Sequence, residues 1–191
     1  MNSAAPAWVN GLKPAREAYR NPLIPGSDIE AWHVPLIFED WVQPEGAAPL
    51  TWYETYGKTQ VTGDDGERSI AEIEIVRRLS TQGYQAYLVD AFGAMPVPAW
   101  KRRTIQLSEM PRWLRELCRN IRRRMNIVKG GDTVGIPDIV AWQPNHTDPL
   151  FIEYKGLKDK TRPAQEEWVR AALLEDSGLE SSIAFAQRVR R

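Results

Sequence analysis

Residues 135–156 read GIPDIVAWQPNHTDPLFIEYKG and contain two short apolar runs separated by a turn. The first run, 136–142, and the second, 150–155, each have the length of a buried strand. The residues between them are rich in Pro, Asn and Asp, which is typical of a tight turn. This stretch therefore predicts a β-hairpin.

Charged side chains interrupt the second strand of this hairpin. Because side chains alternate between the faces of a strand, Glu153 and Lys155 share a face with Phe151. A carboxylate and an ammonium in an apolar strand are costly to desolvate unless they are paired or bind a ligand. Antiparallel pairing about a turn centred near His146 places Asp138 opposite about residue 155, within a step or two of Glu153. Two carboxylates and a lysine are therefore expected to converge at one end of the hairpin.

This combination of groups is suited to metal-dependent hydrolysis of phosphodiesters. Two neighbouring carboxylates repel each other unless a cation lies between them, and Mg²⁺ takes oxygen ligands of this type. Such an ion can polarise a phosphoryl oxygen, and a nearby lysine can orient water or stabilise developing negative charge. We expect Mg²⁺ as the cofactor, with Mn²⁺ able to substitute for it.

Outward from the hairpin, the sequence predicts an α/β fold. Helical spacing of apolar residues, together with cap and stop residues, predicts helices over 69–82, 107–125 and 161–175. Short apolar runs bounded by turn residues predict strands over 84–89 and 182–189. The order helix, strand, inserted helix, strand, strand, helix, strand predicts a mixed sheet flanked by helices.

The domain organisation follows from where prolines and tryptophans gather. Residues 1–60 are rich in both and are interpreted as an N-terminal extension, with candidate strands over 34–42 and 50–56. The main domain is expected over 61–191, with an insertion over 94–132. The role of the extension stays open.

Composition excludes several classes of protein. The chain has 191 residues, of which 42% are hydrophobic and 26% charged, so a packed core is expected rather than disorder. No apolar run approaches the roughly 20 residues of a membrane helix, and residues 1–10 lack the pattern of a secretory signal. The single cysteine, Cys118, excludes an internal disulfide and a paired-cysteine zinc site. We therefore expect a cytoplasmic protein with no membrane partner, in which Cys118 packs in the core and His33 and His146 are structural or exposed to solvent.

Positive charge is concentrated in one segment, although the formal net charge of the chain is zero. Between Lys101 and Lys129 there are ten basic and two acidic residues, a net charge of +8. The predicted helix over 107–125 carries a basic stripe that could follow nucleic-acid phosphates; the alternative is a solvated helix face. The candidate nucleic-acid-binding residues are Arg112, Arg115, Arg119, Arg122, Arg123 and Lys129.

Three motifs stand together in this part of the chain: Gly135-Ile136-Pro137-Asp138, Glu153-Tyr154-Lys155 after the hairpin, and Gln165 three residues before Trp168 on the following helix. They resemble the PD-(D/E)xK nuclease superfamily, most closely its VRR-NUC (virus-type replication-repair nuclease) branch. Glu72, eleven residues before Gly83 on an upstream helix, also fits. The resemblance covers about 69–189 and implies a restriction-endonuclease-like core of order αβββαβ. The basic insertion and the N-terminal extension depart from the family pattern and leave the substrate and the oligomeric state in doubt.

The resemblance implies a role for each matching residue. Asp138 and Glu153 would be metal ligands, joined by the backbone carbonyl of Tyr154. Lys155 would position the attacking water. Glu72 would reach the metal directly or through water, and Gln165 would support the lysine or the scissile phosphate.

The glutamate of the upstream helix has a competing explanation. Ser69 and Glu72 also match a capping box, which alone would explain the glutamate. Because helix starts are imprecise in sequence-based prediction, Glu74 is the alternative site residue.

The sequence thus predicts a metal-dependent endonuclease that hydrolyses DNA, branched or duplex, in replication, repair or recombination, with a homodimer as one expected state. A catalytically silent nucleic-acid-binding module on the same fold and an RNA-directed nuclease are the alternatives. The presence of all three central residues, Asp138, Glu153 and Lys155, argues against the silent module.

Overall fold

The computed structural model of the chain describes residues 15–20, 28–48, 58, 60–89, 104–105, 107–126 and 135–189. The strands are β1 (Ala15–Arg20), β2 (Asp28–Leu36), β3 (Gln60–Thr62), β4 (Arg68–Ile70), β5 (Gln85–Val89), β6 (Thr104–Ile105), β7 (Ile139–Trp142), β8 (Pro149–Lys155) and β9 (Ile183–Arg188). The helices are α2 (Ala71–Thr81), α3 (Arg112–Arg124) and α4 (Pro163–Glu175), with short 3₁₀ segments η2 (Leu107–Glu109) and η3 (Ser177–Ser182).

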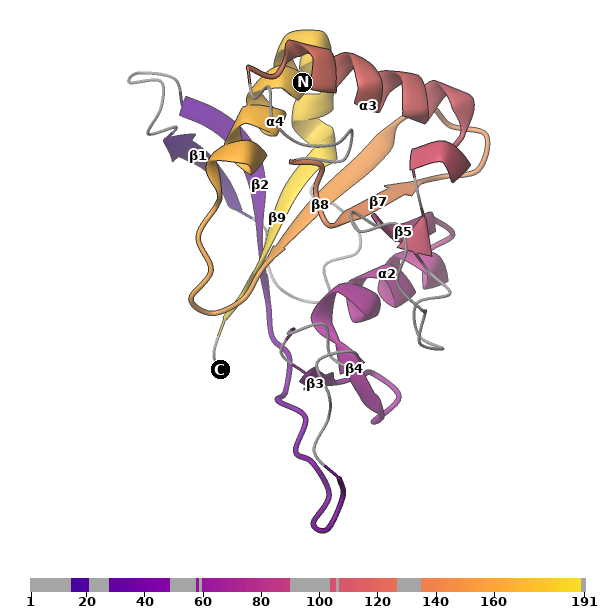
Figure 1. Ribbon diagram of the computed structural model, residues 1–191, viewed down its shortest axis with the longest axis vertical. Helices are drawn as coiled ribbons and strands as arrows, with labels where there is room; N and C mark the ends of the chain where they lie inside the picture. Colours follow the sequence, from indigo (N-terminus) through magenta and orange to yellow (C-terminus); the bar gives the residue numbers. More distant parts are fainter. Residues whose placement is uncertain are drawn as a thin grey trace.

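A mixed seven-stranded sheet forms the centre of the fold, in the order β1-β2-β9-β8-β7-β5-β6 (Figure 1). The pairs β5–β7 and β7–β8 are antiparallel, whereas β8–β9 and β2–β9 are parallel. The series α2, β5, β7, β8, α4, β9 has the predicted order αβββαβ. The predicted α/β fold with a restriction-endonuclease-like core is therefore confirmed.

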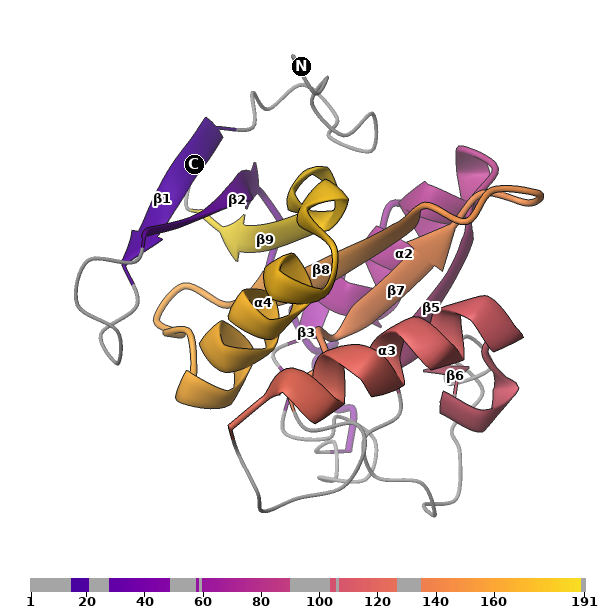
Figure 2. The same ribbon diagram turned by 90° about the horizontal axis from the view of Figure 1, so that it is seen from above.

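Helices cover both faces of the sheet. Figure 2 shows α3 and α4 side by side on one face and α2 on the other. On the α2 face, Ile73 and Leu79 pack in one apolar cluster with Ile152 of β8. On the other face, Phe151 of β8 meets Trp168 of α4 with ring centroids 4.8 Å apart. Because Phe151 and Ile152 point to opposite faces, the charged residues that follow Phe151 at steps of two belong to the α4 face.

Helix α2 begins two residues later than the sequence predicts. Residues 68–70 pair with β3 as strand β4, and the helix starts at Ala71. Ser69 makes no capping hydrogen bond, and its hydroxyl donates instead to the carbonyl of Ile70 at 3.4 Å. The capping-box explanation for Glu72 is therefore wrong. The predicted stop is confirmed, because Gly83 has a φ of +86° and its N–H donates to the carbonyl of Ser80.

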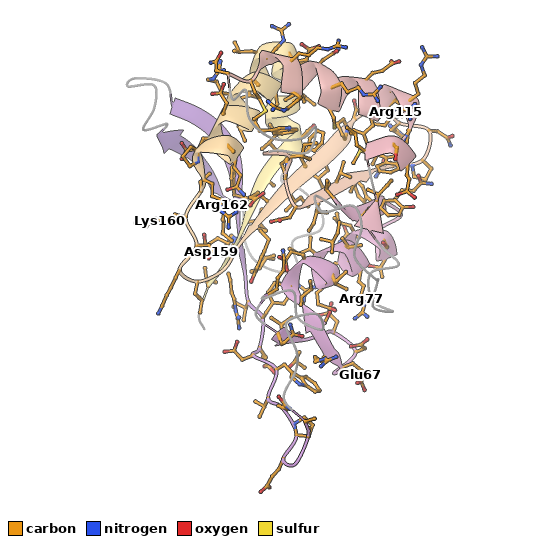
Figure 3. All side chains as sticks on the ribbon, viewed as in Figure 1. Glu67, Arg77, Arg115, Asp159, Lys160 and Arg162 are labelled. Atoms are coloured by element: carbon orange, nitrogen blue, oxygen red, sulfur yellow. The ribbon has the colours of Figure 1, made fainter. Side chains whose placement is uncertain are left out.

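Helix α3 lies in the predicted insertion and starts at Arg112, directly after Pro111, rather than at residue 107. Its inner face is apolar and contains the fully buried Cys118, as predicted. Its arginines are exposed or half-buried. Arg115 on α3 and Arg162 before α4 lie on opposite sides of the molecule in Figure 3.

The N-terminal segment contributes strands to the same sheet. β2 pairs in parallel with β9, and β1 adds to the outer edge of β2. Arg188 of β9 donates to the carbonyl of Phe38 at 2.8 Å and to Asp40 Oδ1 at 2.9 Å, which fixes the chain just after β2. The expected strand over 34–42 begins earlier and ends at Leu36, and the expected strand over 50–56 lies outside the described residues. The domain boundary at residue 60 stays a prediction, but the sheet extends across it.

None of the helices in the described ranges is long and apolar enough to cross a lipid bilayer.

Candidate active site

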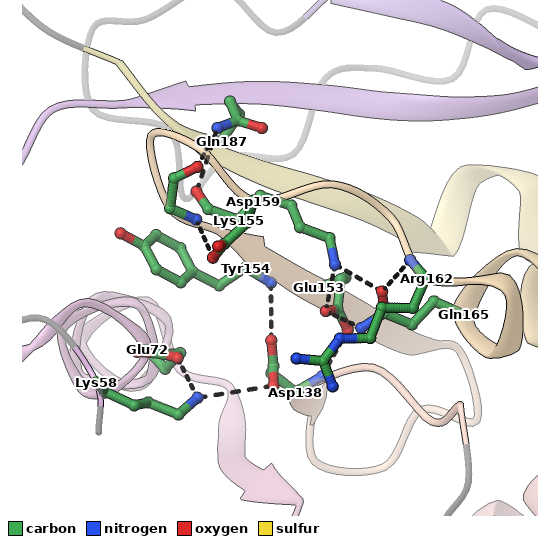
Figure 4. Close-up of polar contacts among 11 residues, drawn as sticks. Lys58, Glu72, Asp138, Glu153, Tyr154, Lys155, Asp159, Arg162, Gln165 and Gln187 are labelled. Atoms are coloured by element: carbon green, nitrogen blue, oxygen red, sulfur yellow. Dashed lines mark hydrogen bonds and ion pairs between the residues drawn. The ribbon is translucent and has the colours of Figure 1, made fainter. Parts of the chain in front are cut away.

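Five predicted site residues come from four separate places in the chain. Asp138 lies just before β7, Glu153 and Lys155 lie at the end of β8, Gln165 lies in the first turn of α4, and Glu72 lies in the first turn of α2. Figure 4 shows all five around one end of the β7–β8 hairpin.

Asp138 and Glu153 are direct neighbours. The register pairs Ile139 with Ile152, so the next step places Asp138 beside Glu153. The N–H of Asp138 donates to Glu153 Oε2 at 3.3 Å, and the N–H of Tyr154 donates to Asp138 Oδ2 at 3.1 Å. The expected pairing of Asp138 with about residue 155 is wrong by two positions, because the turn is centred one residue earlier, before His146. The two carboxylates are closer than the predicted register would have put them.

The ammonium of Lys155 is held in place from two sides. Its Nζ donates to Glu153 Oε1 at 2.9 Å and to Gln165 Oε1 at 2.6 Å. Gln165 also donates to Glu153 and accepts from the N–H of Arg162 at 2.8 Å. The side chains of Glu153 and Lys155 are only 6% and 5% exposed, so this group has little freedom to move.

The backbone directly after Lys155 is also anchored. The N–H of Gly156 donates to Asp159 Oδ2 at 2.9 Å, and Gln187 of β9 donates to the carbonyl of Gly156 at 2.6 Å (Figure 4). These contacts fix the strand end that carries the lysine.

Gly135 allows the segment before Asp138 to approach α4 closely. It has a φ of +78°, and a Cβ atom there would lie 2.4 Å from the carbonyl oxygen of Ala164. Only glycine fits both the dihedral angle and the space. The sequence motif beginning at Gly135 thus has a structural reason, since it packs the segment that leads to Asp138 against the turn of α4 that carries Gln165.

Glu72 is connected to Asp138 through a lysine that the sequence did not identify. The Nζ of Lys58 forms an ion pair with Glu72 Oε1 and lies 3.8 Å from Asp138 Oδ1 (Figure 4). Lys58 belongs to the region interpreted as an extension, and no motif surrounds it. No local signal could have found it, because its contacts come from residues 14 and 80 positions away.

Glu74, the alternative to Glu72, lies elsewhere. It is fully buried, accepts from Arg77 Nη1 at 2.7 Å and accepts from the N–H of Asp64 at 3.2 Å. It therefore binds the turn between β3 and β4. Of the two glutamates, the structure places Glu72 near Asp138.

Burial and the nearby carboxylate of Asp138 disfavour charge on Glu153 and Glu72. Burial, with the neighbouring Asp138 as the second cause, raises the pKa of Glu153 to about 8. Burial also raises the pKa of Glu72. For Lys58, burial acts to lower the pKa, but the carboxylates of Glu72 and Asp138 outweigh it and hold the pKa above its ordinary value. The site therefore favours an added positive charge.

The carboxylates at this site offer oxygen atoms as ligands for a metal ion. No group of three or more His, Cys, Asp and Glu side chains in the described ranges is arranged to hold a metal ion. Lys58 engages Glu72, while Lys155 and Gln165 engage Glu153, so internal donors satisfy the carboxylates. The carboxylate pair of Asp138 and Glu153 nevertheless has the donor chemistry that Mg²⁺ and Mn²⁺ prefer.

The candidate nucleic-acid-binding arginines on α3 differ in exposure and in their contacts. Arg112 pairs with Glu116 at 2.8 Å, and Arg115 donates to the carbonyl of Ser108 at 3.0 Å. Arg112, Arg119 and Arg123 are exposed, and Arg123 donates to Asn120 Oδ1 at 3.3 Å. Arg122 is half-buried, and Lys129 lies outside the described residues.

Histidine and tryptophan side chains away from this group of residues differ in burial. His146 is exposed in the hairpin turn, and the side chain of His33 lies outside the described residues. Trp168 is fully buried beneath α4, and Trp113 packs against the same apolar cluster.

The family model of the VRR-NUC domain matches residues 68–187. The chain belongs to the VRR-NUC family. Comparisons with curated proteins and with solved structures gave no match. The matched range of this VRR-NUC domain contains all five residues gathered at the hairpin end, and it excludes Lys58. Membership confirms the predicted resemblance and indicates a nuclease-type function with a nucleic-acid substrate.

Proposed function

We propose that the chain is a metal-dependent nuclease that hydrolyses DNA phosphodiester bonds. The observation that carries the proposal is the adjacency of the Asp138 and Glu153 carboxylates, with the Lys155 ammonium fixed beside them. Carboxylates from a hairpin, a nearby amine and a VRR-NUC domain are together suited to attack of water on a phosphate.

The residues that would hold Mg²⁺ or Mn²⁺ are Asp138 and Glu153, with the carbonyl of Tyr154, and Glu72 directly or through water. When bound, the ion supplies Lewis-acid polarisation of the phosphate. The raised pKa of Glu153 supports this assignment, because a cation beside the carboxylate would favour its charged form.

Lys155 would act on the water and on the phosphate. Its ammonium lies two residues from Glu153 on the same face, so it can orient an attacking water and offset the negative charge that develops on the phosphate oxygens. Gln165 is a positioning residue, because it accepts from that ammonium and holds its direction.

We further propose that α3 contacts the nucleic-acid backbone. Its exposed arginines can neutralise phosphates but offer no pattern for reading bases, so recognition of structure is favoured over sequence. Arg115 of α3 and Arg162 beside the site lie apart in Figure 3, so a substrate that contacts both α3 and the site would be extended. Branched or duplex DNA in replication, repair or recombination has this property.

The proposal also covers the cellular location and the assembly of the protein. A reducing compartment such as the cytoplasm suits a chain whose one cysteine, Cys118, is buried in the core. A homodimer is the proposed assembly, which sedimentation of the purified chain would test.

Removal of the metal tests the proposed activity. We expect purified protein to cleave single-stranded, duplex or branched DNA with Mg²⁺ or Mn²⁺, and to lose all cleavage with a chelator. Matched RNA substrates decide between DNA and RNA. Tight, salt-sensitive binding without cleavage of any substrate would instead identify a silent binding module.

Charge reversal on α3 tests the proposed contact surface. The double variant Arg119→Glu/Arg123→Glu should raise the Kd for DNA at least about tenfold, since two phosphate contacts are lost. The slope of log Kd against log salt concentration should fall by roughly 2 for the same reason. The double glutamine variant should show a smaller increase in Kd. Unchanged affinity in a salt titration would remove α3 from the interface.

A further inference from the structure

Lys58 joins carboxylates that come from different parts of the fold. It lies in the segment before β3, whereas Glu72 belongs to α2 and Asp138 precedes β7. Its Nζ contacts Glu72 Oε1 and lies 3.8 Å from Asp138 Oδ1, and Figure 4 shows it reaching toward both. A single ammonium thus lies where these two carboxylates approach each other.

The two lysines of the site differ in how freely they can move. The side chain of Lys155 is 5% exposed and held by Glu153 and Gln165. The side chain of Lys58 is 38% exposed, and both of its polar contacts at the site are with carboxylates. Lys58 can therefore leave the carboxylates by turning its flexible stem toward solvent, whereas Lys155 is fixed.

Glu72 depends on a positive neighbour. Its side chain is 5% exposed, and a buried carboxylate without a partner is strongly disfavoured. Lys58 supplies that partner in the described structure. A cation that replaced the ammonium at Glu72 would satisfy the same requirement.

We propose that Lys58 is an internal counter-ion that competes with a divalent cation for Glu72 and Asp138. This inference rests on the proposed metal-dependent function. Both positive groups use the same carboxylate oxygens, so the ammonium must turn away before Glu72 can contribute to metal binding. The competition also fits the finding that the described side chains form no group of three metal-ligating residues while Lys58 holds Glu72.

The affinity of the full chain for Mn²⁺ tests this competition. Lys58→Met keeps the stem and removes the charge, so it should bind Mn²⁺ at least ten times more tightly than wild type in calorimetric titrations. Lys160→Met removes a charge from an exposed lysine in the loop between β8 and α4 and should leave the affinity unchanged (Figure 3).

A second comparison covers the case in which Lys58→Met leaves Glu72 unpaired and fails to fold. Adding Lys58→Met to Glu72→Gln removes both charges, and the expected result is that the double variant binds Mn²⁺ more tightly than Glu72→Gln alone, because Asp138 is released. In thermal melts, Mn²⁺ should raise the Tm of Lys58→Met by more than that of wild type.

The outcomes separate this inference from the proposed function. Wild type and Lys58→Met binding Mn²⁺ equally, or the variant binding more weakly, would overturn the competition and leave the metal site standing. Folded wild type and folded variant that both fail to bind Mn²⁺ would overturn both proposals.

Discussion

Asp138→Asn and Lys155→Met should each lower the rate of DNA cleavage by roughly a hundred- to a thousandfold without unfolding the protein. Asparagine keeps an oxygen that can accept from the N–H of Tyr154 but loses the negative charge that we propose binds the metal ion. Methionine keeps the buried stem of Lys155 but removes the ammonium that Glu153 and Gln165 hold. Single-turnover cleavage with Mg²⁺ measures the rate, and circular dichroism checks the fold.

A matched control lies in the same hairpin. Asp148 is exposed in the turn, so Asp148→Asn removes one carboxylate charge without touching the site and should keep wild-type cleavage. Cleavage that persists in Asp138→Asn would place the activity at another site or in a contaminating nuclease.

Gly135→Ala should lower the free energy of unfolding by about 3–5 kcal/mol, which combines the strain of a positive φ with overpacking. The added Cβ would lie 2.4 Å from the carbonyl oxygen of Ala164, and the backbone of α4 would have to move. Because Gln165 follows Ala164 directly, the same movement should reduce cleavage. Urea denaturation measures the change in stability.

Gly66 provides the control for backbone strain alone. It has a φ of +80°, and a Cβ atom there would meet nothing within 4 Å. Gly66→Ala should therefore cost only about 1–2 kcal/mol. Equal losses for the two variants would show that α4 shifts easily and that the close approach at Gly135 contributes nothing.

The parts of the fold with strong local patterns could be predicted from the sequence. The apolar runs of β7 and β8 are buried on both faces, so their composition alone identifies them as strands. Gly83 ends α2, and Pro163 is the first residue of α4, because each residue fits that position by its own backbone preference. The convergence of Asp138 and Glu153 followed from strand pairing.

Contacts between distant segments could not be predicted. The parallel pairing of β2 with β9 joins residues about 150 positions apart, and no local pattern records it. The register of the hairpin depended on where the turn is centred, and the structure centres it one residue earlier than expected, with Asn145 in the turn at a φ of +67°. Lys58 reaches the site through its contacts with Glu72 of α2 and Asp138 before β7, which lie 14 and 80 positions away. In each case the answer depended on the three-dimensional arrangement of the chain and not on a local sequence pattern.

The position of β9 has a consequence for how the protein is made. It is the last strand that the structure describes, yet it is inserted between β2 and β8. A nascent chain emerging from the ribosome therefore keeps β8 as an open edge, with β2 unpaired on that side, until residues 183–188 have been synthesised. Gln187, which anchors the carbonyl of Gly156, arrives with that same strand. The sheet around the strand that carries Glu153 and Lys155 is thus completed only after β9 has been made, and a product truncated before β9 would lack the pairing that anchors this end of the hairpin.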